Sequence, residues 1–129
     1  MTYEQLIQKA YEAMEFSYSP YSNFKVGAAL LTESGRVYTG CNVEIASFGA
    51  TNCAERTAIF KAISEGEKTF KAIAVVSSSN DYTFPCGICR QVIVEFGKDI
   101  DIIVAKDYDY VVYKIDDLLP KSFTQIDLK

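Results

Sequence analysis

The spacing of apolar side chains predicts an amphipathic helix at the start of the chain, from Thr2 to about Tyr18. The apolar residues on its buried face recur at intervals of three and four: Tyr3, Leu6, Ile7, Ala10 and Met14. Thr2 and Gln5 have the spacing of a capping box, which favours a helix start at this point. The sequence Ser19-Pro20-Tyr21-Ser22-Asn23 then predicts a break into a loop.

Five apolar segments have the length and composition of β-strands. Residues 24–32 and 37–42 are separated by Ser34-Gly35, a turn signal, and are predicted to form a hairpin. The other three segments are short apolar runs, at residues 72–77, 100–105 and 110–115.

Two further helices are predicted between these strands. The first runs from about Cys53 to Ser64, with Asn52 predicted as its N-cap and Gly66 closing it. The second runs from Cys86 to about Phe96 and is closed by Gly97. A short helical turn at residues 116–119 is stopped by Pro120. Helices that alternate with strands indicate layered α/β packing around a mixed sheet.

Length and charge narrow the class of protein. The 129 residues suit one domain, and a hydrophobic content of 49% supplies one core. The net charge is −4, and the Lys and Arg residues are scattered, whereas a nucleic-acid binder normally presents a basic patch. The N-terminus lacks the build of a signal peptide, and no apolar run approaches the roughly 20 residues of a membrane span. We therefore expect a cytoplasmic protein with neither nucleic acid nor membrane as partner.

The chain contains four cysteines and no histidine, and this restricts its chemistry. In a cytoplasmic chain Cys41, Cys53, Cys86 and Cys89 are more often metal-binding or catalytic than disulfide-bonded. Every catalytic device that uses histidine is excluded. A zinc site would have to use thiolates or carboxylates. A proton shuttle would have to be a carboxylate, Lys, Tyr or Cys.

Two segments place cysteine at a predicted helix start, namely Cys53-Ala54-Glu55-Arg56 and Pro85-Cys86-Gly87-Ile88-Cys89. The partial positive charge at a helix N-terminus favours thiolate over thiol. If the two helices lie side by side, three thiolates surround one point and leave a fourth position open. This is the ligand count of a catalytic zinc, whose bound water has its pKa lowered toward ~7.

Other polar side chains near these cysteines suggest supporting roles. Glu55, on the first helical turn, would lie on the open side of the metal and could move protons without being a ligand. Three thiolates leave zinc electron-rich, and Arg56 could withdraw charge by donating a hydrogen bond to a ligand sulfur. Gln91 or Arg90 could do the same from the other helix.

Each of these features is weak when taken singly. A lone C-x-x-C is more often half of a structural zinc site, or a redox pair. A lone Glu on a first turn is usually surface charge, and Cys41 is more often a small buried apolar residue than a ligand. The two segments together, in a chain without histidine, are specific.

The conjunction resembles the zinc nucleobase deaminases, which combine a zinc held by three Cys or by His and two Cys, a non-ligand Glu and a P-C-x-x-C segment. Over nearly its whole length the chain is similar to the small three-cysteine cytidine deaminases. The similar segments are Tyr18 to Ser22 with Phe24, Val26 to Leu30, Gly40 to Glu44, Cys53 to Ala58, Ser64 to Gly66, Cys89 to Gln91, and Leu118 to Pro120 with Phe123. The resemblance implies a single domain over residues 1–129, an α/β/α sandwich with a mixed five-stranded sheet.

The resemblance also implies roles by position. Cys53, Cys86 and Cys89 would hold one Zn²⁺ per chain, and Glu55 would protonate N3 of the pyrimidine and help expel ammonia. The remaining positions would bind substrate: Ala54 through its N–H to the 2-carbonyl, Phe84 through its carbonyl to the 4-amino group, Phe24 against the base, Asn42 and Glu44 to the ribose 3′-hydroxyl, and Phe123 in a neighbouring subunit's site. The family is typically homotetrameric with shared active sites. Many relatives carry Asn and Tyr where this chain has Ile45 and Phe48.

Without the resemblance, the substrate-binding positions have ordinary interpretations. Asn42 and Glu44 could form an Asx turn at a strand end, Phe24 could be core, and Phe123 could be core or interface.

The expected activity is attack of zinc-activated water at C4 of cytidine or 2′-deoxycytidine, which yields uridine or 2′-deoxyuridine in pyrimidine salvage. One alternative is the same chemistry on a cytosine-nucleoside antibiotic such as blasticidin S. Another is a structural zinc module with Cys41 as fourth ligand and a protein partner. A deaminase of RNA or DNA is disfavoured by the acidic charge.

Overall fold

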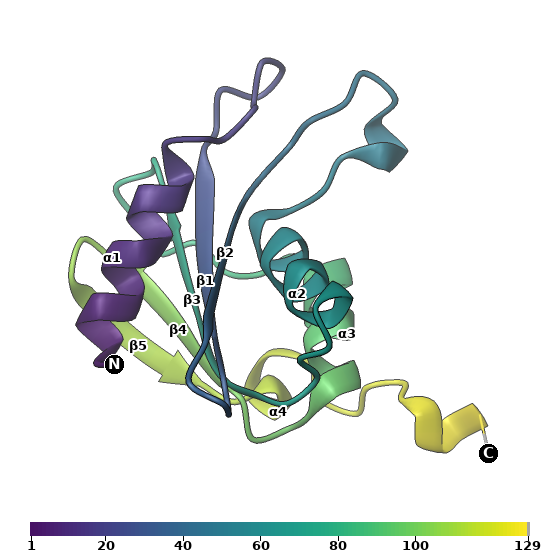
Figure 1. Ribbon diagram of the computed structural model, residues 1–129. Helices are drawn as coiled ribbons and strands as arrows, with labels where there is room; N and C mark the ends of the chain where they lie inside the picture. The colour runs from purple at the N-terminus through teal and green to yellow at the C-terminus, as the bar shows by residue number, and fades with distance from the viewer. Residues whose placement is uncertain (129) are drawn as a thin grey trace.

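A computed structural model describes residues 1–128, and its centre is a five-stranded sheet with the strand order β2-β1-β3-β4-β5 (Figure 1). The strands are β1 Val26–Thr32, β2 Val37–Cys41, β3 Phe70–Ser77, β4 Asp101–Lys106 and β5 Asp109–Tyr113. β3 and β4 pair in parallel and all other neighbours are antiparallel, so the sheet is mixed, as predicted. The last residue of the expected domain, Lys129, lies outside the described range.

Helices cover both faces of the sheet and make three layers. α1 Tyr3–Met14 lies on one face, and α2 Ala54–Ser64, α3 Gly87–Phe96 and the short α4 Ile115–Leu118 lie on the other (Figure 1). Each face has its own buried apolar cluster, one formed by Leu6, Ile7, Ala10, Ala29, Ala74 and Ile103, among others, and one formed around Leu30, Ala58, Ile59, Ile73, Ile93 and Ile102. The predicted α/β/α sandwich is confirmed.

The first helix is shorter than its hydrophobic pattern predicted. The capping box of Thr2 and Gln5 is present, but α1 ends at Met14 rather than near Tyr18. The backbone N–H of Ser17 bonds back only three residues, to Met14, and the N–H of Tyr18 donates instead to the carbonyl of Asn42 at 3.0 Å. The chain therefore leaves the helix because residues around 18 pair with residues 42–44.

The starts of two strands also differ from those predicted from the sequence. β1 begins at Val26 rather than Phe24, because the carbonyl of Phe24 accepts from the Asn42 side chain at 2.8 Å. β3 begins two residues earlier than predicted, at Phe70. The sequence patterns missed two short 3₁₀ turns, Phe48–Ala50 and Gln125–Leu128. No helix within residues 1–128 is both long enough and apolar enough to cross a bilayer.

The cysteines occupy the N-cap positions of the two helices on the site-bearing face. Cys53 caps α2 and Cys86 caps α3, both with extended backbone. The prediction that Asn52 is the cap of α2 was wrong. Its backbone pairs with Val43, and its side chain donates to the Thr57 hydroxyl at 3.0 Å. The cap is displaced by one residue, which puts a sulfur at the point where the helix begins.

Two glycines allow helices to approach the sheet closely on opposite faces. A Cβ on Gly27 would lie 2.0 Å from the carbonyl oxygen of Ala10 in α1. A Cβ on Gly40 would lie 2.4 Å from the carbonyl oxygen of Ala54, in the first turn of α2. Since real Cβ atoms do not make such contacts, the glycine at 40 fixes how near the start of α2 lies to strand β2.

Candidate active site

Three cysteine sulfurs converge where α2 and α3 begin. The Sγ atoms of Cys53, Cys86 and Cys89 all lie within 4.8 Å of one another, and those of Cys53 and Cys86 are 3.6 Å apart. Zinc bound tetrahedrally at about 2.3 Å from each thiolate requires sulfurs about 3.8 Å apart. Three thiol donors at this spacing therefore fit a zinc ion with one further coordination position.

The local electrostatics favour thiolate at one member of the cluster, Cys53, whereas the hydrogen bond to Cys53 and burial raise the pKa of Cys89. Hydrogen bonds from the Cys89 thiol and then from Arg56 lower the pKa of Cys53 to about 5, although burial acts in the opposite direction. Arg56 Nη2 donates to the Cys53 sulfur at 3.2 Å. The Nε of the same guanidinium is buried and has no hydrogen-bond partner among residues 1–128. The predicted contact between Arg56 and a cluster sulfur is thus present.

The carboxyl group of Glu55 lies beside the cluster in an apolar environment. Its side chain is buried, with 3% of the residue exposed, and burial raises the pKa of Glu55 to about 7. The charge of Cys53 raises this pKa further, whereas Arg56 opposes the shift. A carboxyl group with a pKa near neutrality is suited to both accepting and donating a proton at physiological pH.

A cavity of about 260 Å³ opens beside the cysteines and Glu55. Five of the six predicted substrate-binding residues line it, namely Phe24, Asn42, Glu44, Ala54 and Phe84. The sixth, Phe123, does not line it. Phe123 is exposed on the C-terminal segment, which extends away from the sheet (yellow in Figure 1).

Hydrogen bonds fix two polar side chains of this cavity, Asn42 and Glu44. Asn42 donates through Nδ2 to the carbonyl of Phe24 at 2.8 Å and accepts through Oδ1 from the N–H of Val26 at 2.9 Å. Its amide orientation is therefore determined. Glu44 Oε1 accepts from the N–H groups of Tyr21 and Ser22 at 3.0 and 3.1 Å, and its Oε2 accepts from the Ser22 hydroxyl. The Ser22 hydroxyl is the main cause that lowers the pKa of Glu44.

Two residues proposed to support the sulfurs make other contacts. The Gln91 side chain donates to the carbonyl of Phe123, and Arg90 donates to the carbonyls of Pro85 and Leu118, both at 2.7 Å. Neither makes a hydrogen bond to a sulfur in the described part of the chain. Among these three side chains, only Arg56 makes a hydrogen bond to a cluster sulfur in the described chain.

Comparison with known proteins agrees with this geometry. The family model of the cytidine and deoxycytidylate deaminase zinc-binding region matches residues 1–106. The chain belongs to this deaminase family. It is 47% identical to a cytidine deaminase of Sporosarcina psychrophila over 130 residues, covering 99% of this chain and 96% of that protein.

Solved structures of the deaminase family share the whole fold. A cytidine deaminase from Burkholderia pseudomallei superimposes with a TM-score of 0.91 at 49% identity, covering 95% of this chain and 100% of that one. A blasticidin-S deaminase of Bacillus cereus is more distant, at 30% identity over 129 residues. With a zinc-binding family match and three converged cysteines, a zinc ion is the metal of this deaminase site.

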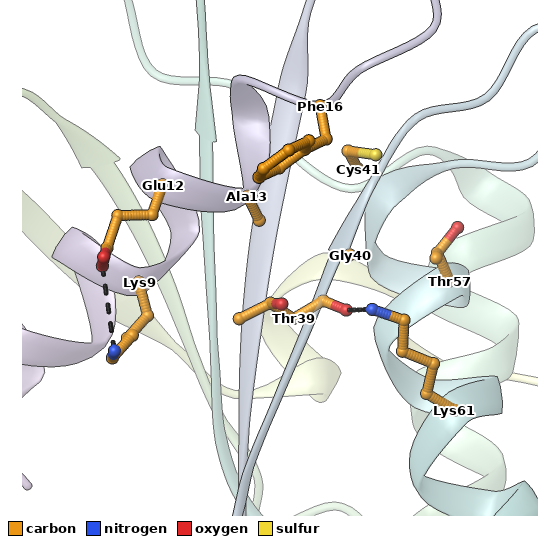
Figure 2. A pocket seen from close by; sticks show the side chains of 9 residues that line it. All are labelled: Lys9, Glu12, Ala13, Phe16, Thr39, Gly40, Cys41, Thr57 and Lys61. Carbon is orange, nitrogen blue, oxygen red and sulfur yellow. Dashed lines mark hydrogen bonds and ion pairs between the residues drawn. The ribbon is translucent and has the colours of Figure 1, made fainter.

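The fourth cysteine of this family member lies elsewhere. Cys41 lines a separate cavity of about 490 Å³ between α1, β2 and α2, near Phe16 (Figure 2). Here the Lys61 ammonium donates to the carbonyl of Thr39 on the outer edge of β2. Burial raises the pKa of the Cys41 thiol. The structure groups only the other three cysteines, which removes the basis for a four-cysteine zinc module.

Sequence patterns did not single out several cavity residues. Val26, Thr51, Asn52 and Thr83 also line the cavity. Asn52 directly precedes Cys53 and Thr83 directly precedes Phe84, which was a usable signal. The role of Ser22 in holding Glu44 carried no such signal, because it depends on two segments that pair only in the fold.

Proposed function

We propose that the chain catalyses the hydrolytic deamination of cytidine and 2′-deoxycytidine to uridine and 2′-deoxyuridine, with release of ammonia, as a step of pyrimidine salvage. The observation that carries the proposal is the buried carboxyl of Glu55 beside three converged cysteines in one cavity. Membership of the deaminase family and relatives named cytidine deaminase at 46–47% identity support it.

Cys53, Cys86 and Cys89 are the residues that would hold one zinc ion per chain. When bound, such an ion acts as a Lewis acid that makes a water nucleophilic near neutral pH. The fit rests on the donor set and its spacing, described above.

Glu55 is proposed to carry the protons of the reaction. Its carboxylate takes a proton from the attacking water and delivers it to N3 of the pyrimidine ring as the C4–O bond forms. It then transfers the second water proton to the departing amino group as the C4–N bond breaks. One water is consumed and one ammonia leaves, so the protonation state of Glu55 is restored. A pKa of about 7 suits both directions of transfer.

The cavity wall is proposed to recognise the base. The N–H of Ala54, in the first turn of α2, has no intrahelical acceptor and is available for the 2-carbonyl oxygen. The carbonyl of Phe84 would accept from the 4-amino group, and the ring of Phe24 would pack against the pyrimidine. Together these groups select a cytosine over a uracil, because uracil has no 4-amino donor.

Asn42 and Glu44 are proposed to bind the sugar. The second hydrogen of the Asn42 amide and the carboxylate of Glu44 offer a donor and an acceptor to one hydroxyl, the 3′-hydroxyl of the ribose. Neither residue depends on a 2′-hydroxyl, which supports the use of both ribo- and deoxyribonucleosides.

A cytoplasmic homotetramer with shared active sites is the proposed assembly. Phe123 is 58% exposed on the C-terminal segment, where it could reach a neighbouring subunit's cavity. The outer faces of α2 and α3 also expose apolar side chains, including Phe60 and Ile88. Sedimentation or light scattering would test the mass, and a monomer would contradict the shared site.

The deciding experiment follows the ultraviolet absorbance of cytidine with zinc-loaded protein and measures ammonia release. Glu55→Gln should keep zinc and fold but lose nearly all turnover. Substantial activity in this variant would overturn the proton-transfer role. A competition of kcat/KM between cytidine and blasticidin S would separate the proposed function from that alternative. A preference for the antibiotic would reverse the substrate assignment.

A further inference from the structure

The turn that precedes β1 lies against the polar side of the cavity. The N–H of Tyr18 donates to Asn42, and the N–H of Glu44 donates back to Tyr18 at 2.8 Å. This places Ser22 beside the Glu44 side chain, 22 positions later in the sequence. The contact is non-local, so the turn can fix a cavity residue that lies on a different strand end.

The Ser22 hydroxyl connects two different walls of the cavity. Its oxygen accepts from the backbone N–H of Phe24 at 3.0 Å, and its O–H donates to Glu44 Oε2. Phe24 is the proposed base contact and Glu44 the proposed sugar contact. One hydroxyl therefore sets the position of the sugar-binding carboxylate relative to the base-binding ring.

We propose that Ser22 is a positioning residue that holds the Glu44 carboxylate in the orientation needed to bind the 3′-hydroxyl of the nucleoside. This inference rests on the proposed function. Glu44 Oε1 is already held by two backbone N–H groups, which survive any change of the Ser22 side chain. The hydroxyl is the only side-chain donor to Glu44 Oε2 in the described chain, so it fixes the rotation of the carboxylate.

The effect should fall mainly on the sugar carboxylate, because Phe24, which also donates to the Ser22 hydroxyl, stays held at its carbonyl by the Asn42 side chain. Asn42 is held by Phe24 and Val26 independently of Ser22, and the base-binding N–H of Ala54 belongs to α2. Losing the hydroxyl removes a charge-assisted hydrogen bond, which is among the stronger kinds. We therefore expect Ser22→Ala to raise KM for 2′-deoxycytidine about tenfold, with kcat within about twofold of wild type.

The experiment compares two substrates that differ only at the 3′ position. For 2′-deoxycytidine, kcat/KM should fall about tenfold in Ser22→Ala. For 2′,3′-dideoxycytidine, which lacks the 3′-hydroxyl, kcat/KM or its inhibition constant should change by no more than about twofold. Ser22→Thr keeps a hydroxyl and should restore most of the loss. Ser47→Ala is the matched control and should behave as wild type. Ser47 is exposed and makes no side-chain cap hydrogen bond to the following 3₁₀ turn.

Each outcome decides the assignment. An equal loss on both substrates would mean that Ser22 acts on the fold or the base wall, and would overturn the positioning role. So would unchanged kinetics on 2′-deoxycytidine. Wild-type protein that turns over neither cytidine nor 2′-deoxycytidine would instead refute the proposed function, and the inference with it. Thermal unfolding of each variant identifies any general loss of folding.

Discussion

Arg56 donates a hydrogen bond to the sulfur of Cys53, the residue that caps its own helix, over a distance of 3.2 Å. The guanidinium thus places a permanent positive charge on a cluster of three thiols. It is the side chain in the described chain that offsets the negative charge of three thiolates. The helix N-termini add smaller partial charges of the same sign.

Arg56→Gln should therefore weaken catalysis or zinc binding by about 10- to 100-fold, which is the usual effect of removing a partner of a metal ligand. Zinc per chain and kcat/KM, measured on the same preparation, check this. Arg36→Gln is the matched control, because Arg36 lies in the β1–β2 turn with its side chain 67% exposed. Unchanged zinc content and kinetics in Arg56→Gln would show that its contact with Cys53 is incidental.

Replacing single cysteines distinguishes the cysteines of the zinc cluster from Cys41 in the other cavity. Cys86→Ser should abolish tight zinc binding, because it removes one of three converged thiols. Cys41→Ser should retain one zinc per chain and most activity, since Cys41 lies in the other cavity (Figure 2). Loss of zinc in Cys41→Ser would return the four-cysteine structural site to consideration.

Much of this arrangement was readable from the sequence because it is local. The helix starts at Cys53 and Cys86, the hairpin around Gly35 and the capping box of Thr2 each depend on a few adjacent residues. What failed depends on distant partners. α1 ends at Met14 because the backbone of Tyr18 pairs with Asn42. Asn52 does not cap α2 because its own backbone pairs with Val43. A hydrophobic pattern holds no information on such pairings.

In the candidate site, too, local features were predictable and contacts with distant partners were not. The cluster was predictable because a shared helix geometry brings together cysteines at two helix starts. The contacts of Gln91 and Arg90 were not, since Gln91 donates to Phe123 and Arg90 donates to Leu118, both about 30 residues later in the chain. The contact of Arg56 with a cluster sulfur could be expected from the sequence because its partner, Cys53, is three residues away.

The contact between Tyr3 and Asp101 joins α1 to the start of β4 and predicts a pH effect on stability. The hydrogen bond to Asp101, aided by burial, raises the pKa of Tyr3 from 10.0 to about 12. A raised native pKa means that the protonated phenol stabilises the fold. This contribution is complete below pH 10 and is lost as the pH rises toward about 12.

Tyr3→Phe should accordingly lower the free energy of unfolding by about 1 kcal/mol near neutral pH. The difference from wild type should disappear between about pH 10 and 12. Urea unfolding at a series of pH values measures it. Tyr18→Phe, at an exposed tyrosine whose hydroxyl makes no hydrogen bond within residues 1–128, is the control. A difference that persists above pH 12 would exclude the phenol–carboxylate bond as its source.

The contact of Gly40 with the first turn of α2 predicts a large effect from a single methyl group. Gly40→Ala would place Cβ 2.4 Å from the carbonyl oxygen of Ala54 and 2.6 Å from the nitrogen of Ala58. We expect a loss of about 3 kcal/mol in unfolding free energy, the upper end of overpacking costs. Gly49→Ala, where a Cβ meets no atom within 4 Å, should be close to neutral. Equal midpoints in urea for the two variants would contradict the close approach.

The ammonium of Lys61, set against the carbonyl of Thr39, has a consequence for how copies of the chain can meet. β2 is an outer strand of the sheet, and an outer strand normally invites a foreign strand to continue the ladder. Here one acceptor of that ladder is already taken, and a charged side chain stands in the path of an arriving backbone. A charged side chain on an edge strand is one of the ways in which proteins discourage edge-to-edge growth into fibrils.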